Sequence, residues 1–129
     1  MNGTHPNGIL TVKASGALRK GEIVKFAGEN KVAEDHSYEA VGATLDAAAD
    51  GALVPIALFG AYPGTILVRP KSGSEPAKVS GGMPLDASGK YETSGALIGR
   101  ALGPADADGL IEIAHRLPVA VGVAAGQVA

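Results

Sequence analysis

His5, His36 and His115 are the residues of this 129-residue chain best suited to bind a metal or transfer a proton. They are far apart, and we find no His-x-x-x-His or His-Glu pairing that would present two ligands on one face. The chain has no cysteine, which excludes thiolate ligands, disulfides and a thiol nucleophile. We therefore predict no metal ligand, and expect each histidine to be a surface or strand residue.

Other patterns associated with catalysis are weak. Asp106-Ala107-Asp108-Gly109 superficially resembles the start of a calcium loop, but the sixth-position glycine and twelfth-position glutamate are missing. A turn that closes a hairpin explains this segment better. The sequence contains no Gly-x-Ser-x-Gly elbow, phosphate-binding loop or dinucleotide fingerprint, and few aromatic residues that could line a sugar cleft. We predict a protein that is not an enzyme, with no catalytic residue and no cofactor.

The elements that would carry such residues form a motif that occurs twice, at an offset of about 57 residues. Each copy is an apolar run, a turn and a second apolar run, preceded by a glycine-led segment. Two hairpin copies predict a small pseudo-symmetric β domain, because a solenoid needs at least three repeats. The segments are Gly21–Phe26, Val41–Leu45 and Leu53–Leu58 in the first copy, and Gly81–Asp86, Ile98–Leu102 and Leu110–His115 in the second.

Composition also favours strands. The chain has 19 glycines, 8 prolines and no tryptophan, so its core must come from valine, isoleucine and leucine. We predict an all-β, barrel-like single domain, with the hairpins either side by side or swapped into a closed barrel. Because Pro55 lacks an amide hydrogen, Leu53–Phe59 should be an edge or bulged strand. Further strands are predicted at Lys31–Ala33, Ala40–Asp46, Thr65–Arg69, Lys90–Thr93, Ala96–Leu102 and Leu110–Leu117, with a polar loop at Lys71–Gly82.

Three segments are expected along the chain: an N-terminal arm at 1–12, a β domain at 13–118 and a small-residue tail at 119–129. Residues 1 to about 8 have little to pack. Ile9–Ala14 alternates weakly, and is either a first strand or part of an arm that becomes ordered by strand addition to a partner. The uncharged tail is expected to lie along the body or across a subunit boundary.

Charge is distributed in blocks. Residues 1–32 carry a net charge of +3, and residues 33–61 carry −5, within a total of −2. The basic block suits docking on an acidic protein, but it is too dilute for nucleic acid. The N-terminus resembles no signal peptide, and no stretch reaches 18 large apolar residues, so we expect no membrane partner.

In pattern and composition the chain resembles the head decoration proteins of tailed bacteriophages. The resemblance covers most of residues 9–117 and rests on Gly21–Phe26, Val41–Leu45, Val54–Gly60, Pro63–Val68, and Ile98–Leu102 followed by Leu110–Ile113. It implies a β-tulip fold and a homotrimer at three-fold and quasi-three-fold positions on the outer surface of the mature virion. The partner would be the major capsid protein.

In that family the N-terminal arm often pairs with strands of the capsid protein. The matching segment here is Thr4–Val12, which gives capsid-binding residues at Thr4, His5, Pro6, Asn7, Ile9, Leu10 and Val12. On this basis we expect deletion of residues 1–12 to leave the fold intact and to abolish capsid binding. The alternative is a β-clip or lipoyl-like binding module of a multi-protein complex. For that module Lys90 is the nearest candidate for a modified lysine, although it lacks small apolar or methionine neighbours.

Overall fold

A computed structural model describes residues 8–71, 79–89 and 96–118, which form nine strands and no helix. Within these residues no helix is present that could cross a membrane. The predicted all-β fold is confirmed. The strands of the first copy are β1 (Ile9–Ala14), β2 (Ile23–Phe26), β3 (Lys31–Glu34), β4 (Gly42–Thr44) and β5 (Leu53–Leu58). Those of the second are β6 (Ile66–Val68), β7 (Pro84–Asp86), β8 (Leu97–Ala101) and β9 (Ile111–His115).

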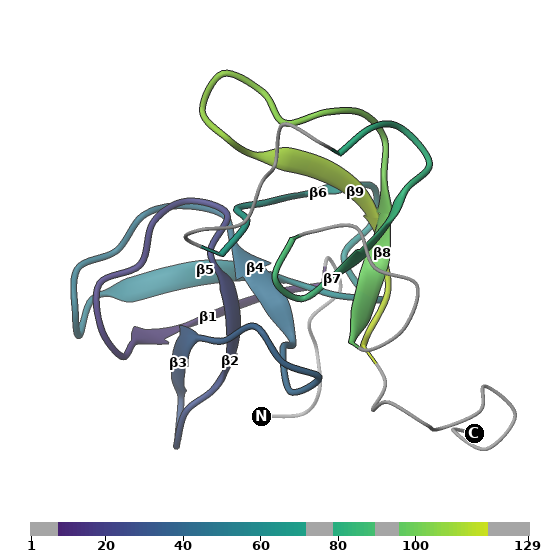
Figure 1. Ribbon diagram of the computed structural model, residues 1–129. Helices are drawn as coiled ribbons and strands as arrows, with labels where there is room; N and C mark the ends of the chain where they lie inside the picture. The colour runs from purple at the N-terminus through teal and green to yellow at the C-terminus, as the bar shows by residue number, and fades with distance from the viewer. Residues whose placement is uncertain (1–7, 72–78, 90–95, 119–129) are drawn as a thin grey trace, which may run out of the picture.

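The first five strands close a barrel in the order β1-β3-β2-β4-β5, and the last four form a sheet in the order β6-β9-β8-β7 (Figure 1). Only the β1–β3 pair in the barrel is parallel. The second sheet lies beside the barrel, and the two share a core. A short parallel bridge between Glu22 and Arg69 also joins them, through a hydrogen bond of 2.7 Å from the Arg69 amide to the Gly21 carbonyl.

The sequence repeat is a structural repeat with the same register. In the first hairpin Gly42 pairs with Leu58, and in the second Gly99 pairs with His115, so both partners are shifted by 57 residues. The glycine-led segments also correspond. Gly21 donates to the Thr44 carbonyl as Gly82 donates to the Ala101 carbonyl. The order β1-β5-β4-β2 therefore corresponds to β6-β9-β8-β7.

The copies differ at β3, which closes the barrel in the first copy. Its counterpart would fall between β7 and β8, a stretch that includes residues 90–95, outside the described residues. The strand predicted at Lys90–Thr93 and the tail at 119–129 also lie outside them. Most of the other predicted strands are found with shorter bounds, but β3 is one residue longer than the predicted Lys31–Ala33. β7 lies within the segment Gly81–Asp86, for which the sequence predicts only a glycine-led segment.

Two clusters of buried apolar side chains form the core. The barrel interior holds one, made by Val12, Ala14, Leu18, Val24, Val32, Val54 and Ile56. The other lies between barrel and second sheet, and takes Ile23, Ala43, Ala57 and Phe59 from the first copy and Ile98, Ile111 and Ile113 from the second, among others. Alternation along each strand explains this division, since Ile23 faces the shared cluster and the next residue, Val24, faces the barrel interior.

The prediction that β5 is an edge or bulged strand is wrong. β5 pairs with β1 on one side and with β4 on the other. The proline is tolerated because β4 ends at Thr44, so the missing amide of Pro55 lies beyond the last ladder pair. Its carbonyl still accepts a hydrogen bond of 2.9 Å from Leu45.

The boundary of the N-terminal arm at residue 12 is also wrong. Five residues of β1, Ile9 to Lys13, pair with β5, and Val12 is 4% exposed in the barrel core. Deletion of residues 1–12 would therefore remove a barrel strand. Of the proposed arm residues, Ile9, Leu10 and Val12 belong to the barrel, whereas Thr4, His5, Pro6 and Asn7 lie outside the described residues.

Candidate functional site

The side chains of three residues lie close together at one mouth of the barrel: Glu22, Glu34 and His36. We call these three residues the mouth cluster. One ligand atom from each side chain lies within 4.8 Å of the other two. The antiparallel register that pairs Val24 with Glu34 continues through a hydrogen bond from the Asp35 amide to the Ile23 carbonyl. Extended by two residues from the Val24–Glu34 pair, the same register places Glu22 opposite His36. Pleating then places the three side chains on the same face.

The His36 imidazole is held from both sides. Its Nδ1 lies 2.8 Å from the Ala87 carbonyl oxygen, and its Nε2 lies 2.8 Å from Glu34 Oε2. A carbonyl can only accept, so Nδ1 carries a hydrogen and donates it to Ala87. The His36 side chain is 10% exposed, so the expectation of a surface or strand residue is wrong. This histidine follows β3 and is packed between the barrel and the segment after β7.

Glu22 is the most buried carboxylate among the described residues, with a side chain that is 4% exposed. Its Oε1 accepts a hydrogen bond of 2.9 Å from Arg19 Nε, whereas its Oε2 is buried without a partner. Thr44 positions this residue. The Thr44 hydroxyl donates to the Arg19 carbonyl at 2.6 Å and accepts from the Glu22 amide at 3.0 Å.

The other sequence candidates have structural roles. His115, on β9, accepts a hydrogen bond of 2.8 Å from the Gly60 amide at Nδ1, so its Nε2 donates to the carbonyls of Tyr62 and Gly64. Asp106 Oδ1 accepts from the amides of Asp108 and Leu110, as expected of a hairpin turn. His5 and Lys90 lie outside the described residues.

A second feature is an open edge on the barrel, formed by Ile9 and Thr11 and called the open edge below. Hydrogen bonds from β1 to β5 use residues 8, 10, 12 and 14, so the amides and carbonyls of Ile9 and Thr11 face away from β5. On that side β3 begins only opposite Lys13. Within the described residues, no backbone hydrogen bond reaches Ile9 or Thr11 from this side.

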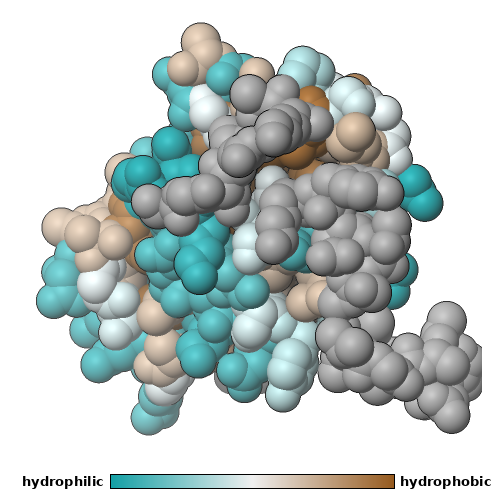
Figure 2. Space-filling view, in the orientation of Figure 1, coloured by the Kyte–Doolittle hydropathy of each residue, from teal (hydrophilic) through white to brown (hydrophobic). Residues whose placement is uncertain are grey.

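Two lysines lie beside the open edge. Lys13 and Lys31 are neighbours in the β1–β3 register, and both are exposed. No ion pair joins either of them to a carboxylate of the described residues. Figure 2 shows a largely hydrophilic barrel surface on the visible face, with apolar colour in small separate areas. An unpaired strand edge next to two cations is suited to an extended, acidic segment of a partner.

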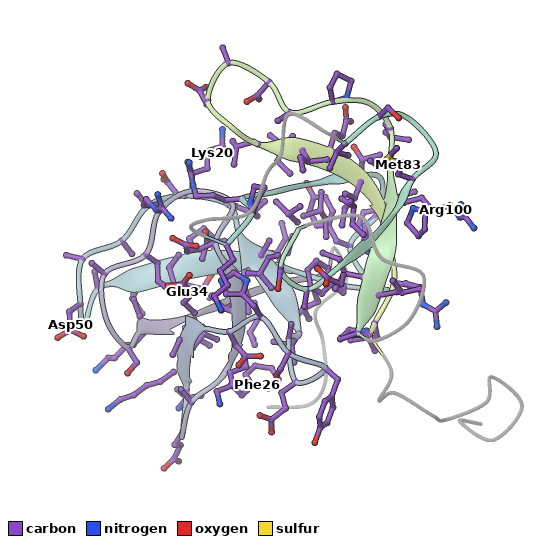
Figure 3. The ribbon with its side chains drawn as sticks, viewed as in Figure 1. Lys20, Phe26, Glu34, Asp50, Met83 and Arg100 are labelled. Atoms are coloured by element: carbon purple, nitrogen blue, oxygen red, sulfur yellow. The ribbon has the colours of Figure 1, made fainter. Side chains whose placement is uncertain are left out.

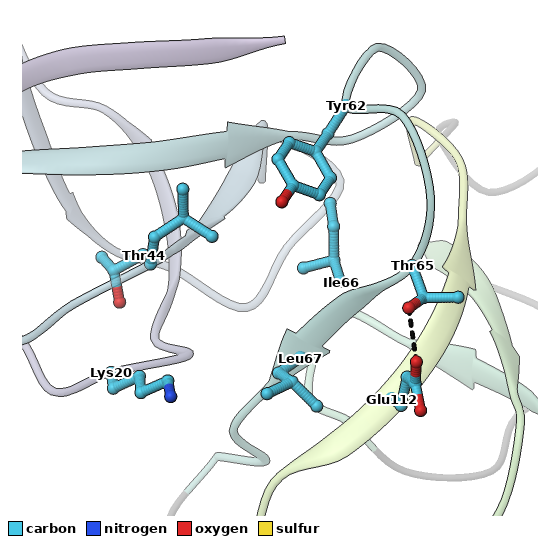
Figure 4. A pocket seen from close by; sticks show the side chains of 8 residues that line it. Lys20, Thr44, Tyr62, Thr65, Ile66, Leu67 and Glu112 are labelled. Atoms are coloured by element: carbon cyan, nitrogen blue, oxygen red, sulfur yellow. Dashed lines mark hydrogen bonds between the residues drawn. The ribbon is translucent and has the colours of Figure 1, made fainter. Parts of the chain in front are cut away.

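A surface hollow of about 480 Å³ lies between the barrel and the second sheet (Figure 4). Lys20, Thr44 and Leu45 line it from the first copy, and β6 and Glu112 from the second. The hydroxyl of Thr65 donates to Glu112 Oε2 across its rim. The Thr44 hydroxyl bonds to the backbone of Arg19 and Glu22, so both threonine hydroxyls that line the hollow already have protein partners.

Comparison with known proteins assigns no family. No protein-family model matches the chain, and no curated protein matches its sequence.

Proposed function

We propose that this protein is a tailed-bacteriophage head decoration protein. It binds the outer surface of the mature capsid as a homotrimer at three-fold and quasi-three-fold positions, and stabilises the shell against the pressure of the packaged genome. The resemblance of the sequence supports this proposal, since its characteristic segments correspond to β2, β4, β5, β6, β8 and β9. The observation that carries it is the open edge of β1.

The open edge provides the contact. A strand of the major capsid protein pairs with the free amides and carbonyls of Ile9 and Thr11, extending the barrel sheet by strand addition. Acidic side chains next to that strand contact Lys13 and Lys31. The proposed contact also includes the predicted arm residues Thr4 to Asn7, which precede β1 in the sequence and lie outside the described residues.

A trimer makes such a short contact sufficient. Two residues of free edge provide few hydrogen bonds, and a single contact of that size is weak. Three copies that bind simultaneously raise the effective local concentration of each contact, so the assembly is held far more tightly than one chain.

The first test is the protein composition of purified virions of the phage that encodes this chain. A copy number near one per major capsid protein is expected for a trimer at every three-fold and quasi-three-fold position. Absence of the chain from the particle would contradict the proposal and would favour the binding module of a multi-protein complex.

A pair of variants tests the open edge itself. Thr11→Pro removes one outward amide without removing a hydrogen bond to β5, whereas the matched Thr11→Val keeps that amide. Thr11→Pro should lower co-sedimentation with expanded capsids at least tenfold, and Thr11→Val should leave it unchanged. Equal binding by two folded variants would exclude strand addition at this edge.

The charged part of the contact is tested separately. The double variant Lys13→Glu/Lys31→Glu should weaken capsid binding, and the salt dependence of wild-type binding should be lost with it. Glu29→Lys, which raises the net charge of residues 1–32 without changing either lysine, is the control. Binding by the double variant with unchanged affinity and salt dependence would show that the two lysines lie outside the interface.

A further inference from the structure

The mouth cluster contains two carboxylate oxygens, Glu34 Oε2 and Glu22 Oε2, that receive no hydrogen bond from a neutral His36. His36 donates from Nδ1 to Ala87, so a neutral imidazole has only a lone pair at Nε2. That lone pair faces Glu34 Oε2, which is also an acceptor, at 2.8 Å. Two acceptors at this distance repel unless a proton or a cation lies between them.

The second of these oxygens belongs to Glu22. Its Oε2 is buried and has no hydrogen-bond partner, although the other oxygen of the same carboxylate is bound by Arg19. An unpartnered buried carboxylate oxygen is costly. A proton on His36 Nε2 would satisfy Glu34 but not Glu22. One cation in contact with all three side chains would satisfy both.

We propose that the mouth cluster binds a divalent transition-metal ion, for which Zn²⁺ is the best match. His36 Nε2, one Glu34 oxygen and Glu22 Oε2 are the ligands. A nitrogen ligand with two carboxylates suits zinc better than calcium or magnesium, which prefer oxygen ligands alone. Tetrahedral zinc holds its ligand atoms roughly 3.3 Å apart. One ligand atom from each of the three residues already lies within 4.8 Å of the others, so small side-chain movements would bring a ligand set to that spacing.

The surroundings resemble those of metal-binding histidines. Nδ1–H bonded to a backbone carbonyl fixes the tautomer that leaves Nε2 free to bind metal, as is usual in such sites. Arg19 beside Glu22 reduces the negative charge: with a neutral His36, Arg19 and the mouth cluster together carry −1 in the absence of metal and +1 with a divalent ion. Figure 3 places Glu34 on the barrel, away from Met83 and Arg100 of the second copy.

All three proposed ligands belong to the first copy, and a hydrogen bond from His36 connects the site to the second copy. Glu22 and Glu34 belong to the barrel, and His36 is fixed to Ala87, directly after β7. Metal binding should therefore stabilise the whole molecule by linkage. The role is structural and does not depend on the proposed capsid function.

The test is a calorimetric titration of ZnCl₂ into the full-length, EDTA-treated protein, with thermal unfolding measured in parallel. We expect one ion per chain and a rise in Tm of at least about 5 °C at a hundredfold excess over Kd. Glu34→Gln should weaken binding at least tenfold. Glu39→Gln, an acid 58% exposed and outside the cluster, is the matched control and should bind as the wild type does.

Two further measurements make the outcome decisive. His5→Ala should bind zinc normally, which would place the site away from the N-terminal segment. With Co²⁺ as probe, visible absorption should show nitrogen and oxygen ligation in the wild type and should be lost in His36→Gln. Failure to saturate at one ion per chain, or equal binding by Glu34→Gln and Glu39→Gln, would overturn the proposal and leave His36 paired to Glu34 through a proton.

Discussion

At the scale of single residues, the repeat depends on two glycines where neighbouring backbones come closest. A Cβ on Gly42 would lie 2.2 Å from the Ala57 carbonyl oxygen, and one on Gly99 would lie 2.1 Å from the Ala114 carbonyl oxygen. These positions are equivalent in the two hairpins. Backbone oxygens in a paired strand cannot move aside, so a methyl group would separate β4 from β5 or β8 from β9.

Gly42→Ala is therefore expected to lower the free energy of unfolding by about 3 kcal/mol or more, because a ladder must open to admit the side chain. Gly103→Ala is the control, since nothing lies within 4 Å of the Cβ it would add. The control should change stability by less than about 1 kcal/mol. Urea denaturation followed by circular dichroism measures both, and similar losses would refute the steric explanation.

Single residues also explain why the sequence did not predict that Glu22, Glu34 and His36 lie together. Glu34 and His36 are two residues apart and share a strand face, a signal that a search for two-histidine spacings misses. Glu22 is twelve residues away from Glu34, and only the β2–β3 register brings it opposite His36. The contact between His36 and Ala87 spans 51 residues and depends on how the two copies pack.

At the scale of elements, hairpins were the predictable part of the fold. Alternating apolar residues bounded by glycine and acidic turns specify β4–β5 and β8–β9 with little ambiguity. Sequence reasoning was wrong where a strand's neighbours decide its environment. Pro55 suggested an edge, but a proline only requires the absence of a partner at one position, which the end of β4 provides. Ile9–Ala14 was ambiguous because weak alternation fits both an arm and a strand.

His115 holds the connection between β5 and β6 against β9. Its two ring nitrogens bond to the backbone of Gly60, Tyr62 and Gly64. His115→Ala removes these bonds and leaves the backbone groups to water, so we expect a loss of about 2 kcal/mol. Arg116→Ala, on the adjacent and exposed residue, should lie within about 0.5 kcal/mol of the wild type. If the two variants unfold at the same urea concentration, His115 does not fix this connection.

At the scale of the whole molecule, the boundary between arm and body decides which truncations fold. Deletion of residues 2–7 leaves every described strand in place, whereas deletion of residues 1–12 removes most of β1 and the buried Val12. The shorter deletion should unfold within about 2 °C of the full chain, and the longer one should lack a cooperative transition. Thermal unfolding of both proteins distinguishes this from an arm that ends at residue 12, for which both would fold.

The two copies also differ in how their cores are shared. The barrel has an interior of its own, whereas the described apolar side chains of the second sheet pack in the cluster shared with the first copy. Ile56 and Ile113 occupy equivalent positions, both fully buried, one in the barrel interior and the other in the shared cluster. A molecule that unfolds as one unit should lose about 2 to 5 kcal/mol from Ile→Ala at either site.

Hydrogen exchange shows whether that loss reaches both copies. In Ile113→Ala, protection should fall in the slowest amides of β4 and β5 as well as in β8 and β9, since the shared cluster supports both hairpins. In Ile56→Ala, protection should fall in the same four strands if the second sheet depends on the closed barrel for its stability. A barrel that keeps full protection when Ile113 is truncated would instead be an independent folding unit, with the second copy added to it.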